Sequence, residues 1–448
     1  CVEPRGPTTG AAVATVAVWG GWHLGPVVAG GLASLGWHQV LASDLDVGTV
    51  EALRVAAPLV REPGLADLLA SQLELGTLEV LHPSDPQLGS ARMVVMALDV
   101  DVDDHDEPSL ERVEATAARI GELLAAPIPL VVMSQVPVGT CERLARLAGE
   151  RFGEPLPVAC VPENLRLGNA LDGFFHPDRL VAGAGDERAR AAVEDLFAGI
   201  ECPLVWMAVR SAEMSKHALN AYLATCISFS SEIADLCERA GADARDVVRA
   251  LRSDRRVSDR APLVPGLGFA GGTLGRDLRH LMRIGAAAGA PTPLVEAVAE
   301  VNRRRIAMVA GRVERSVGSL RDAAVALLGL TYKPGTDTLR RSQSLEVAAD
   351  LRARGAAVRG HDPMLGPERS TDVGFPVCSD PYEAAAGADA VVVMTPWPEY
   401  RSLDLARLAA SMRRPFVFDP GALLDAAAAA QAGIAREVVG AASPGVGG

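Results

Sequence analysis

Short apolar runs alternate with longer segments rich in Ala, Leu and Arg, and this alternation constrains the fold more than any other feature. In the first half the runs include "TVAVWG" (15–20), "ARMVVMALDV" (91–100) and "PIPLVVMSQV" (127–136). Apolar runs of strand length that are separated by helical segments are what a parallel sheet covered on both faces requires. We therefore predict a doubly wound α/β domain in this half, with its first helix over 24–36.

The middle and the end of the chain follow different patterns. From about 209 to 316 the strand signals stop, and "SAEMSKHALNAYLATCISFSSEIADLCERAG" (211–241) contains no proline and no internal glycine. This stretch predicts one long helix that ends at Gly241 and whose apolar face pairs with a second copy of the chain. Alternation then resumes with "AAVALLGLTY" (323–332) and "DAVVVMT" (389–395). The sequence thus predicts an α/β fold with two Rossmann-like, doubly wound domains joined by a long central helix and a helical middle domain.

Composition excludes several classes of protein. The 448 residues include 43 basic and 56 acidic side chains, a net charge of -13, and no basic run interrupts this acidity. Polymeric nucleic acid and anionic membranes are therefore not expected as partners. The seven cysteines are odd in number and show no CxxC spacing, which favours a reducing cytoplasm over a disulfide framework or a metal site. No apolar run reaches the length of a membrane span.

A glycine-rich turn, "GGWHLG" (20–25), follows the first apolar run, and Asp44 closes the second run 24 residues after Gly20. Strand, glycine turn, helix, strand and acid, in this order, are typical of dinucleotide-binding domains. Gly20 would form the turn, Gly25 would let the helix pack on the strand, and Asp44 would accept a ribose hydroxyl. The middle glycine of the pattern is replaced by Trp22, so its indole must either swing away or block the pyrophosphate. The alternative is an α/β turn that binds no dinucleotide.

Lysine is almost absent, since 41 of the 43 basic residues are arginines and only Lys216 and Lys333 remain. Arginine replaces lysine where only a positive charge is needed, but not where a compact, deprotonatable ammonium is needed. Lys216 lies on the predicted long helix, one turn before Asn220 on the same face. Lys333 lies in a turn after a strand, where α/β sheets collect ligands. The two positions therefore indicate ligand chemistry, the alternative being two leftover surface charges.

Four segments together resemble the UDP-glucose/GDP-mannose dehydrogenase family over nearly the whole chain. They are "REPGLADLL" (61–69), "VPENLRLGNALDGFFHPDRLVAG" (161–183), "SKHALNAYLATCISFSSEIADLCERAGAD" (215–243) and "LGLTYKPGTDTLR" (328–340). The resemblance implies NAD as cofactor and a nucleotide sugar as substrate, whose C6 alcohol is oxidised to the acid in two NAD-dependent steps. The implied parts are an N-terminal dinucleotide-binding domain (13–208), a helical central and dimerisation domain (209–316) and a C-terminal nucleotide-sugar-binding domain (317–440). The residues at the two ends predict a flexible leader (1–12) and a flexible tail (441–448).

The resemblance also implies roles for individual residues. Lys216 matches the active-site lysine of the family, and Asn220 matches the asparagine beside it. Asp277 matches an aspartate that helps to activate water, and Glu163 matches a glutamate that acts in hydrolysis of the acyl intermediate. The residues implied to bind NAD are Gly20, Gly25, Asp44, Ser134 and Arg340, and those implied to bind substrate are Lys216, Asn220, Gly268, Lys333 and Arg256, the last from across a dimer.

Three departures from the family pattern are equally informative. The family loop that reads like "GGSCFPKD" carries the nucleophilic cysteine, whereas this chain has Thr273 there and no cysteine within 264–277. A hydroxyl is a much weaker nucleophile than a thiolate unless a base activates it. A "CVPTP"-like segment is replaced by "MALDVDV" (96–102), and a substrate arginine is missing around Gly421.

We therefore expect a cytoplasmic, homodimeric NAD-dependent oxidoreductase that acts on the C6 alcohol of a UDP-glucose-like nucleotide sugar. Two outcomes remain open: the reaction stops at the aldehyde because of Thr273, or water held by Asp277 and Lys216 completes it. The alternative from another class is a catalytically inactive homologue that serves as a binding or structural partner, with Trp22 and Thr273 as its marks.

Overall fold

The computed structural model describes residues 15–37, 39–100, 108–269 and 272–441. The chain forms two compact units, residues 1–218 and 219–448, and each is described by itself. The predicted leader (1–12) lies outside the described residues, as does the predicted tail except for residue 441.

The first unit is built on an eight-stranded sheet with the order β3-β2-β1-β4-β5-β6-β7-β8. All neighbouring strands are parallel except β6 and β7. Strand order reverses between β1 and β4, and ligands of open α/β sheets bind at such a switch point, beyond the carboxyl ends of the strands. The strands are β1 (Thr15–Trp19), β2 (Gln39–Ser43), β3 (Leu78–Val80), β4 (Met93–Met96), β5 (Leu130–Val132), β6 (Val158–Cys160), β7 (Leu180–Ala184) and β8 (Leu204–Met207).

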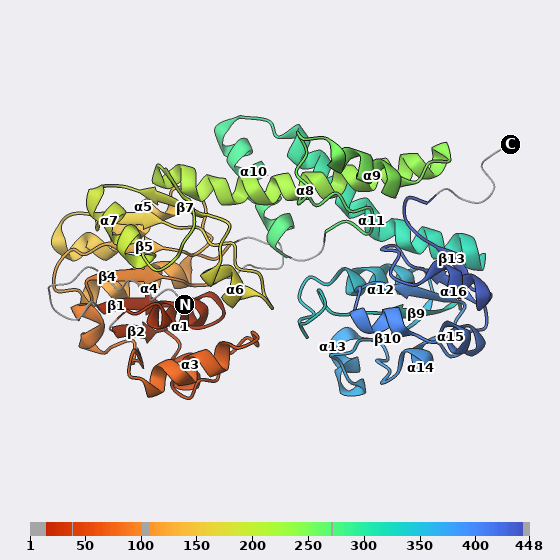
Figure 1. Ribbon diagram of the computed structural model, residues 1–448, viewed down its shortest axis with the longest axis horizontal. Coiled ribbons are helices and arrows are strands. Elements are labelled where there is room, and N and C mark those ends of the chain that lie inside the picture. The colour runs from red at the N-terminus through yellow and green to blue at the C-terminus, as the bar shows by residue number, and fades with distance from the viewer. Residues whose placement is uncertain (1–14, 38, 101–107, 270–271, 442–448) are drawn as a thin grey trace. The chain divides into compact units, whose positions relative to one another are not determined.

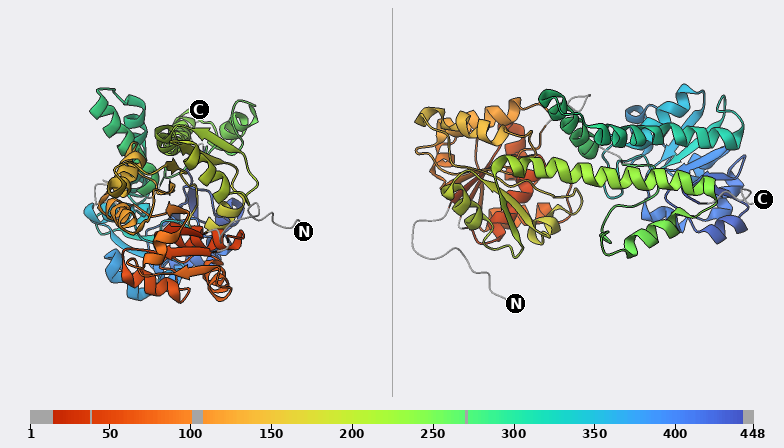
Figure 2. Two further views of the ribbon diagram at one scale, coloured as in Figure 1. Left: turned by 90° about the vertical axis from the view of Figure 1, so that its left-hand side faces the viewer. Right: turned by 90° about the horizontal axis from the view of Figure 1, so that it is seen from above.

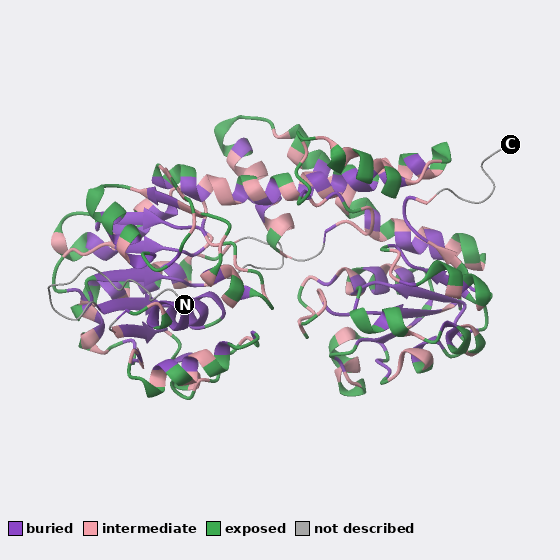
Figure 3. Cartoon of the chain, in the orientation of Figure 1, coloured by how far each residue is buried: buried purple, intermediate pink, exposed green. Residues whose placement is uncertain are grey.

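Helices cover both faces of this sheet, as the apolar runs predict (Figure 1). Successive residues of a strand point to opposite faces, so Val16 and Val18 join the core beneath α1, α3, α6 and α7, whereas Ala17 and Trp19 join the core beneath α4 and α5. The strands are buried and the outer helix faces are exposed (Figure 3). The helices are α1 (Leu24–Ser34), α2 (Val47–Arg54), α3 (Leu65–Glu74), α4 (Glu111–Leu123), α5 (Thr140–Gly149), α6 (Ala170–Phe175) and α7 (Glu187–Leu196).

The second unit contains a five-stranded parallel sheet with the order β10-β9-β11-β12-β13. This is the other common doubly wound order, and its switch point lies between β9 and β11. The strands are β9 (Ala324–Leu328), β10 (Ala357–His361), β11 (Ala390–Val393), β12 (Phe416–Phe418) and β13 (Ala435–Glu437). The helices are α9 (Ala244–Ser253), α10 (Gly272–Ala288), α11 (Pro293–Val317), α12 (Gln343–Ala353), α13 (Ser370–Val373), α14 (Pro381–Ala385), α15 (Leu405–Ser411) and α16 (Ala426–Gln431).

Helix α8 (Val209–Ala240) is the long helix that the sequence predicts, and it is unbroken over its 32 residues (Figure 2). It ends before Gly241, whose φ of 72° is unfavourable for other residues. Its last turns bury Ala234 and Cys237 in the same core as the second sheet. Three large apolar side chains on α8 are exposed at intervals of seven residues: Tyr222, Phe229 and Leu236.

Two features are absent from the described ranges. No helix within them is both long and apolar enough to cross a membrane. No group of three or more His, Cys, Asp and Glu side chains within them is arranged to hold a metal ion.

Candidate functional site

The glycine turn of the first unit has the geometry that a dinucleotide requires. Gly20 has a φ of 131°, and a Cβ there would lie 2.3 Å from the carbonyl oxygen of Ala97. A Cβ on Gly25 would lie 1.8 Å from the carbonyl oxygen of Gly20. Only glycine therefore lets α1 begin directly against the ends of β1 and β4. The N-terminus of a helix placed in this way is a site for the cofactor's pyrophosphate.

Asp44 lies just beyond β2, as the sequence predicts, but its carboxylate already has partners. Nη2 of Arg112 lies 2.7 Å from each of its two oxygens, and the amide of Asp46 donates to Oδ1 at 2.9 Å. The Asp44 side chain is buried, whereas Arg112 is partly exposed. Each carboxylate oxygen can accept more than one hydrogen bond, so Asp44 can still bind a ribose hydroxyl beside the guanidinium.

Asp99 is a candidate site residue that the sequence analysis missed, although the "MALDVDV" segment around it was noted. Its Oδ2 accepts hydrogen bonds from the backbone amides of His23 and Leu24, both at 3.1 Å. These amides form the N-terminus of α1. Burial raises the pKa of the Asp99 carboxyl, and the two amides, His23 and Arg112 offset part of that rise. A carboxylate therefore occupies donors that a dinucleotide pyrophosphate would use.

Trp22 takes the first of the two arrangements that the sequence left open. Its side chain is 43% exposed, and the indole meets the imidazole of His23 edge-on, with ring centroids 6.4 Å apart. The indole is therefore not packed into the buried turn. Whether it weakens cofactor binding stays a prediction.

Glu62 brings together two of the segments on which the family resemblance rests. One carboxylate oxygen accepts the amide of Gly168 at 2.8 Å and lies 3.1 Å from Nε2 of His23, and the other accepts the amide of Ala170 at 2.7 Å. Glu62 is buried. It therefore ties "REPGLADLL" to the start of α6 and to the glycine turn.

Ser134, which the resemblance implies in cofactor binding, is buried just beyond β5. Its hydroxyl oxygen accepts the amide of Leu98 at 2.9 Å, and the hydroxyl lies 3.4 Å from the carbonyl oxygen of Met96. In this structure Ser134 therefore fixes the chain that leads from β4 to Asp99.

Lys216 and Glu163, the two catalytic candidates of the first unit, lie together. Nζ of Lys216 donates to the carbonyl oxygen of Glu163 at 2.6 Å and to Oδ1 of Asn164 at 3.0 Å. The Glu163 carboxylate turns back to accept the amide of Leu165. Burial raises the pKa of Glu163, an effect that the charge of Lys216 partly offsets. A raised pKa brings a carboxyl closer to the range that suits acid-base chemistry.

Asn220 and Asp277 are joined in the second unit. Nδ2 of Asn220 donates to Oδ2 of Asp277, and both side chains are buried. Nε of Arg276 lies 3.6 Å from Oδ1 of Asp277. This hydrogen bond fixes the Asp277 carboxylate on α10. The catalytic roles of the two residues stay predictions.

Thr273, at the position where the family resemblance implies a nucleophilic cysteine, is exposed near the start of α10. All six cysteines in the described part of the chain are free, and none lies in the glycine-rich loop. The pKa of Cys141 is raised by its hydrogen bond with Cys160 and by burial, and burial also raises the pKa values of Cys202 and Cys378. These three thiols remain protonated and are poor nucleophiles.

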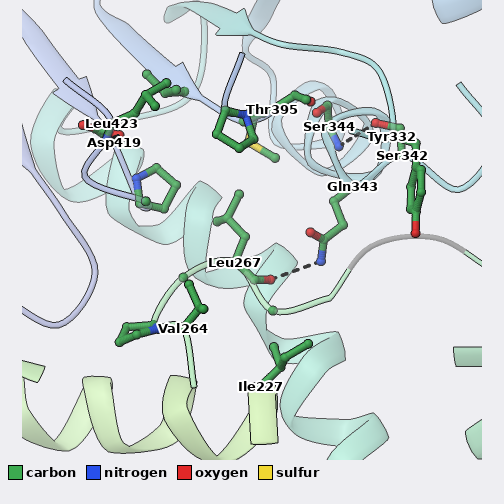
Figure 4. Close-up of a pocket in the computed structure, with 18 of the residues that line it drawn as sticks. Ile227, Val264, Leu267, Tyr332, Ser342, Gln343, Ser344, Thr395, Asp419 and Leu423 are labelled. Atoms are coloured by element: carbon green, nitrogen blue, oxygen red, sulfur yellow. Dashed lines mark hydrogen bonds between the residues drawn. The ribbon is translucent and has the colours of Figure 1, made fainter. Parts of the chain in front are cut away.

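A cavity of about 300 Å³ lies in the second unit at the switch point between β9 and β11 (Figure 4). Nε2 of Gln343 donates to the carbonyl oxygens of Leu267 and Phe269, at 3.1 and 3.0 Å, and so holds the glycine-rich loop against the sheet. Apolar walls with a few fixed polar groups are typical of small-molecule sites. The lining residues are Ile227, Pro262, Val264, Pro265, Gly266, Leu267, Gly268, Thr331, Tyr332, Ser342, Gln343, Ser344, Val393, Met394, Thr395, Pro396, Asp419, Pro420, Gly421 and Leu423.

The other candidate residues of the second unit differ in whether they line the cavity. Gly268 lines the cavity, whereas Lys333 and Arg340 lie in the loop after β9 but are not among the lining residues. Arg256 is exposed and pairs with Asp254, its Nη2 lying 2.7 Å from Oδ2. Its implied role across a dimer remains a prediction.

An ion pair flanks Gly421, around which the sequence analysis expects a substrate arginine of the family to be replaced. The buried Asp419 accepts Nε of Arg436 at 3.0 Å and the amides of Leu423 and Leu424 at 2.9 and 2.8 Å. Gly421 itself lines the cavity. Asp419 therefore fixes the shape of this wall of the cavity. Arg436 is the first basic residue after Gly421 in the sequence.

Two doubly wound sheets, one with a dinucleotide-type turn and one with a cavity at its switch point, define a two-domain dehydrogenase fold. The chain belongs to the UDP-glucose/GDP-mannose dehydrogenase family. It matches the family's NAD binding domain over residues 14–201, its central domain over 210–304 and its UDP binding domain over 326–426.

Curated relatives and a solved structure agree with this assignment. The chain is 35% identical to a UDP-glucose 6-dehydrogenase of Rhizobium meliloti over 85% of this chain and 89% of that protein. It is 31% identical to UDP-glucose 6-dehydrogenase YwqF of Bacillus subtilis over 90% and 92% of the two chains. A UDP-glucose dehydrogenase structure from Pyrobaculum islandicum matches with a TM-score of 0.87 and 33% identity, over 99% of this chain and 100% of the other.

Proposed function

We propose that this protein oxidises the C6 alcohol of a UDP-glucose-like nucleotide sugar with NAD and releases the aldehyde. The NAD binding and UDP binding domains of the family support the two ligand classes. The names of the relatives support UDP-glucose as the first substrate to test. The observation that carries the proposal is the ammonium of Lys216, which is held by the Glu163 carbonyl and by Asn164.

The chain's own residues account for the first oxidation. Gly20, Gly25 and Asp44 would hold the cofactor, which when bound accepts a hydride from C6. Removing that hydride also requires loss of the hydroxyl proton, which passes to water, while a compact ammonium that donates to the C6 oxygen stabilises the alkoxide as it develops. Lys216 is the group of the right type, and two acceptors, the Glu163 carbonyl oxygen and Oδ1 of Asn164, fix the position of its ammonium.

Thr273 supports a reaction that ends at the aldehyde, which makes this chain a divergent member of its family. A second oxidation requires the aldehyde to take up a nucleophile before another hydride leaves. A threonine hydroxyl is a weak nucleophile without a base, and Thr273 is exposed near the start of α10. Water positioned by Asp277 could replace it, and the product therefore distinguishes the two outcomes.

An inactive homologue is the second candidate, and one observation favours it. The Asp99 carboxylate accepts hydrogen bonds from the amides at the N-terminus of α1. These are the donors that a bound cofactor would need. The Asn220–Asp277 and Lys216–Asn164 contacts favour the enzyme, because a silent relative does not need to keep these polar groups in place.

We expect NADH to form when the purified protein is mixed with NAD and UDP-glucose. A panel that also contains GDP-mannose and two UDP-linked N-acetylhexosamines identifies the preferred sugar and base, and absorbance of NADH follows the reaction. Glucose without the nucleotide serves as the control, since it lacks the part that the UDP binding domain would hold. No NADH with any sugar of the panel, from a folded protein that binds UDP, would support the inactive homologue.

We also propose a homodimer that pairs through residues 210 to 240. The exposed Tyr222, Phe229 and Leu236 recur every seven residues along α8 and form an apolar stripe that a second copy of the helix would cover. Light scattering at micromolar concentration should give a dimer, and Phe229→Glu should give a folded monomer because it places a charge within the stripe. Val55→Glu, a matched change at an exposed apolar residue away from α8, should leave a dimer. A monomeric wild type would contradict this proposal.

We propose a cellular compartment and a division of the chain into parts. Six free cysteines in the described ranges suit a reducing compartment such as the cytoplasm. We also retain the division into parts at 13–208, 209–316 and 317–440, with the note that the last turns of α8 share a core with the second sheet.

A further inference from the structure

We propose that Asp99 is an internal competitor of the cofactor: its carboxylate holds the amides at the N-terminus of α1 that the NAD pyrophosphate must take, so NAD binds weakly until Asp99 is displaced or protonated. The inference concerns cofactor binding alone. It rests on the NAD binding domain and on the contacts of Asp99, and it does not require the sugar chemistry proposed above.

The amides at the start of α1 are the contested groups. The first amides of a helix have no partner within the helix, so they seek an acceptor elsewhere. Helix α1 has no acidic residue in its first turn, and the side chain of His23, which precedes it, makes no capping hydrogen bond. Asp99, more than 70 residues later, supplies the acceptor for His23 and Leu24 instead. A pyrophosphate that approached the same amides would meet a negative charge already in place.

The backbone before Asp99 is held tightly, so the carboxylate has to move by side-chain rotation. The carbonyl oxygen of Ala97 lies against Gly20 so closely that a Cβ on Gly20 would be only 2.3 Å away. The next amide, that of Leu98, is bound by the hydroxyl of Ser134. Asp99 itself is only partly buried, and solvent can therefore receive the carboxylate when a ligand displaces it.

The charges that face Asp99 determine how pH enters. Burial raises the pKa of Asp99, whereas His23 and Arg112 favour its ionised form, and the charge of Asp99 in turn raises the pKa of Glu163. Protonation of Asp99 removes the charge that repels a pyrophosphate. Above the pKa of Asp99, NAD binding is therefore accompanied by proton uptake, and affinity rises as pH falls.

Calorimetric titration of the full-length protein with NAD, without any sugar, tests the inference. Asp99→Asn keeps the shape and an oxygen acceptor but removes the charge, so the fold of the turn is retained. At about pH 8 we expect this variant to bind NAD about ten-fold more tightly than wild type, or better, which corresponds to 1.4 kcal/mol or more. The difference should shrink as pH falls toward the pKa of Asp99, which burial raises, because protonated wild type resembles the variant. His23 and Glu163 are present in both proteins, so the difference isolates Asp99.

Two controls make the result specific. Adenosine has no pyrophosphate, so Asp99→Asn should not change its affinity. Trp22→Gly tests the rival obstruction that the sequence suggests, and a gain confined to this variant would assign the obstruction to the indole. Equal NAD affinity of wild type and Asp99→Asn at about pH 8, including the case in which neither binds measurably, would overturn the inference. NADH formation with UDP-glucose could still occur in that case, so failure here is distinguishable from failure of the proposed function.

Discussion

Replacing Lys216 by arginine is expected to reduce the rate of NADH formation from UDP-glucose by about 10²- to 10³-fold, the usual loss when one donor to a developing oxyanion is removed. Nζ of Lys216 is seated 2.6 Å from the Glu163 carbonyl oxygen and 3.0 Å from Oδ1 of Asn164. A guanidinium is planar and larger than an ammonium, so it cannot keep both contacts and also direct a donor to the sugar. The charge is retained while the geometry is lost.

The matched control for this change is Arg210→Lys, which exchanges the same two side-chain types on the same helix. Arg210 is exposed and pairs with Glu142, outside the proposed site. Its exchange should leave the rate unchanged, because surface ion pairs tolerate either cation. The melting temperatures of both variants show whether the fold is intact. A folded Lys216→Arg variant with undiminished activity would mean that the position of this lysine is unrelated to catalysis.

Replacing Thr273 by cysteine should change the product rather than the rate of the first step. A thiol near the start of α10 lies close to the amides of a helix N-terminus, which lower a cysteine pKa and favour the nucleophilic thiolate. The thiolate can add to the aldehyde, after which a second hydride leaves for NAD and water releases the acid. We therefore expect NADH formed per UDP-glucose to rise from one toward two.

Thr273→Ser is the control for that experiment, because it keeps a hydroxyl of similar size and supplies no thiol. It should release the aldehyde as wild type does, and it should resist iodoacetamide where Thr273→Cys is inactivated. If Thr273→Cys also stops at one NADH, then the loop as a whole, and not the missing thiol, limits the reaction.

Much of the fold could be predicted because it depends on local patterns. The apolar runs gave the parallel sheets, and Gly20, Gly25 and Asp44 gave the dinucleotide-type turn, since spacing along the chain determines these features. The neighbours Lys216 and Glu163 were both identified from motifs, and the structure brings them together.

The contacts that qualify the site depend on side chains far apart in sequence. Asp99 reaches the amides of α1, and Arg112 reaches Asp44 across 68 residues. No periodicity or turn pattern encodes such a contact, because it arises only when β1, β2, β4 and α4 are assembled. The replaced "CVPTP"-like segment pointed to the region of Asp99. It did not reveal that the Asp99 carboxylate binds the amides that we expect a pyrophosphate to use.

The stoichiometry of the wild-type reaction tests the central claim most directly. With UDP-glucose limiting and NAD in excess, NADH is counted at completion and the sugar product is trapped with hydroxylamine and identified by mass. We expect one NADH per UDP-glucose and an oxime of the C6 aldehyde. Two NADH per UDP-glucose, with the C6 acid as the product, would contradict it.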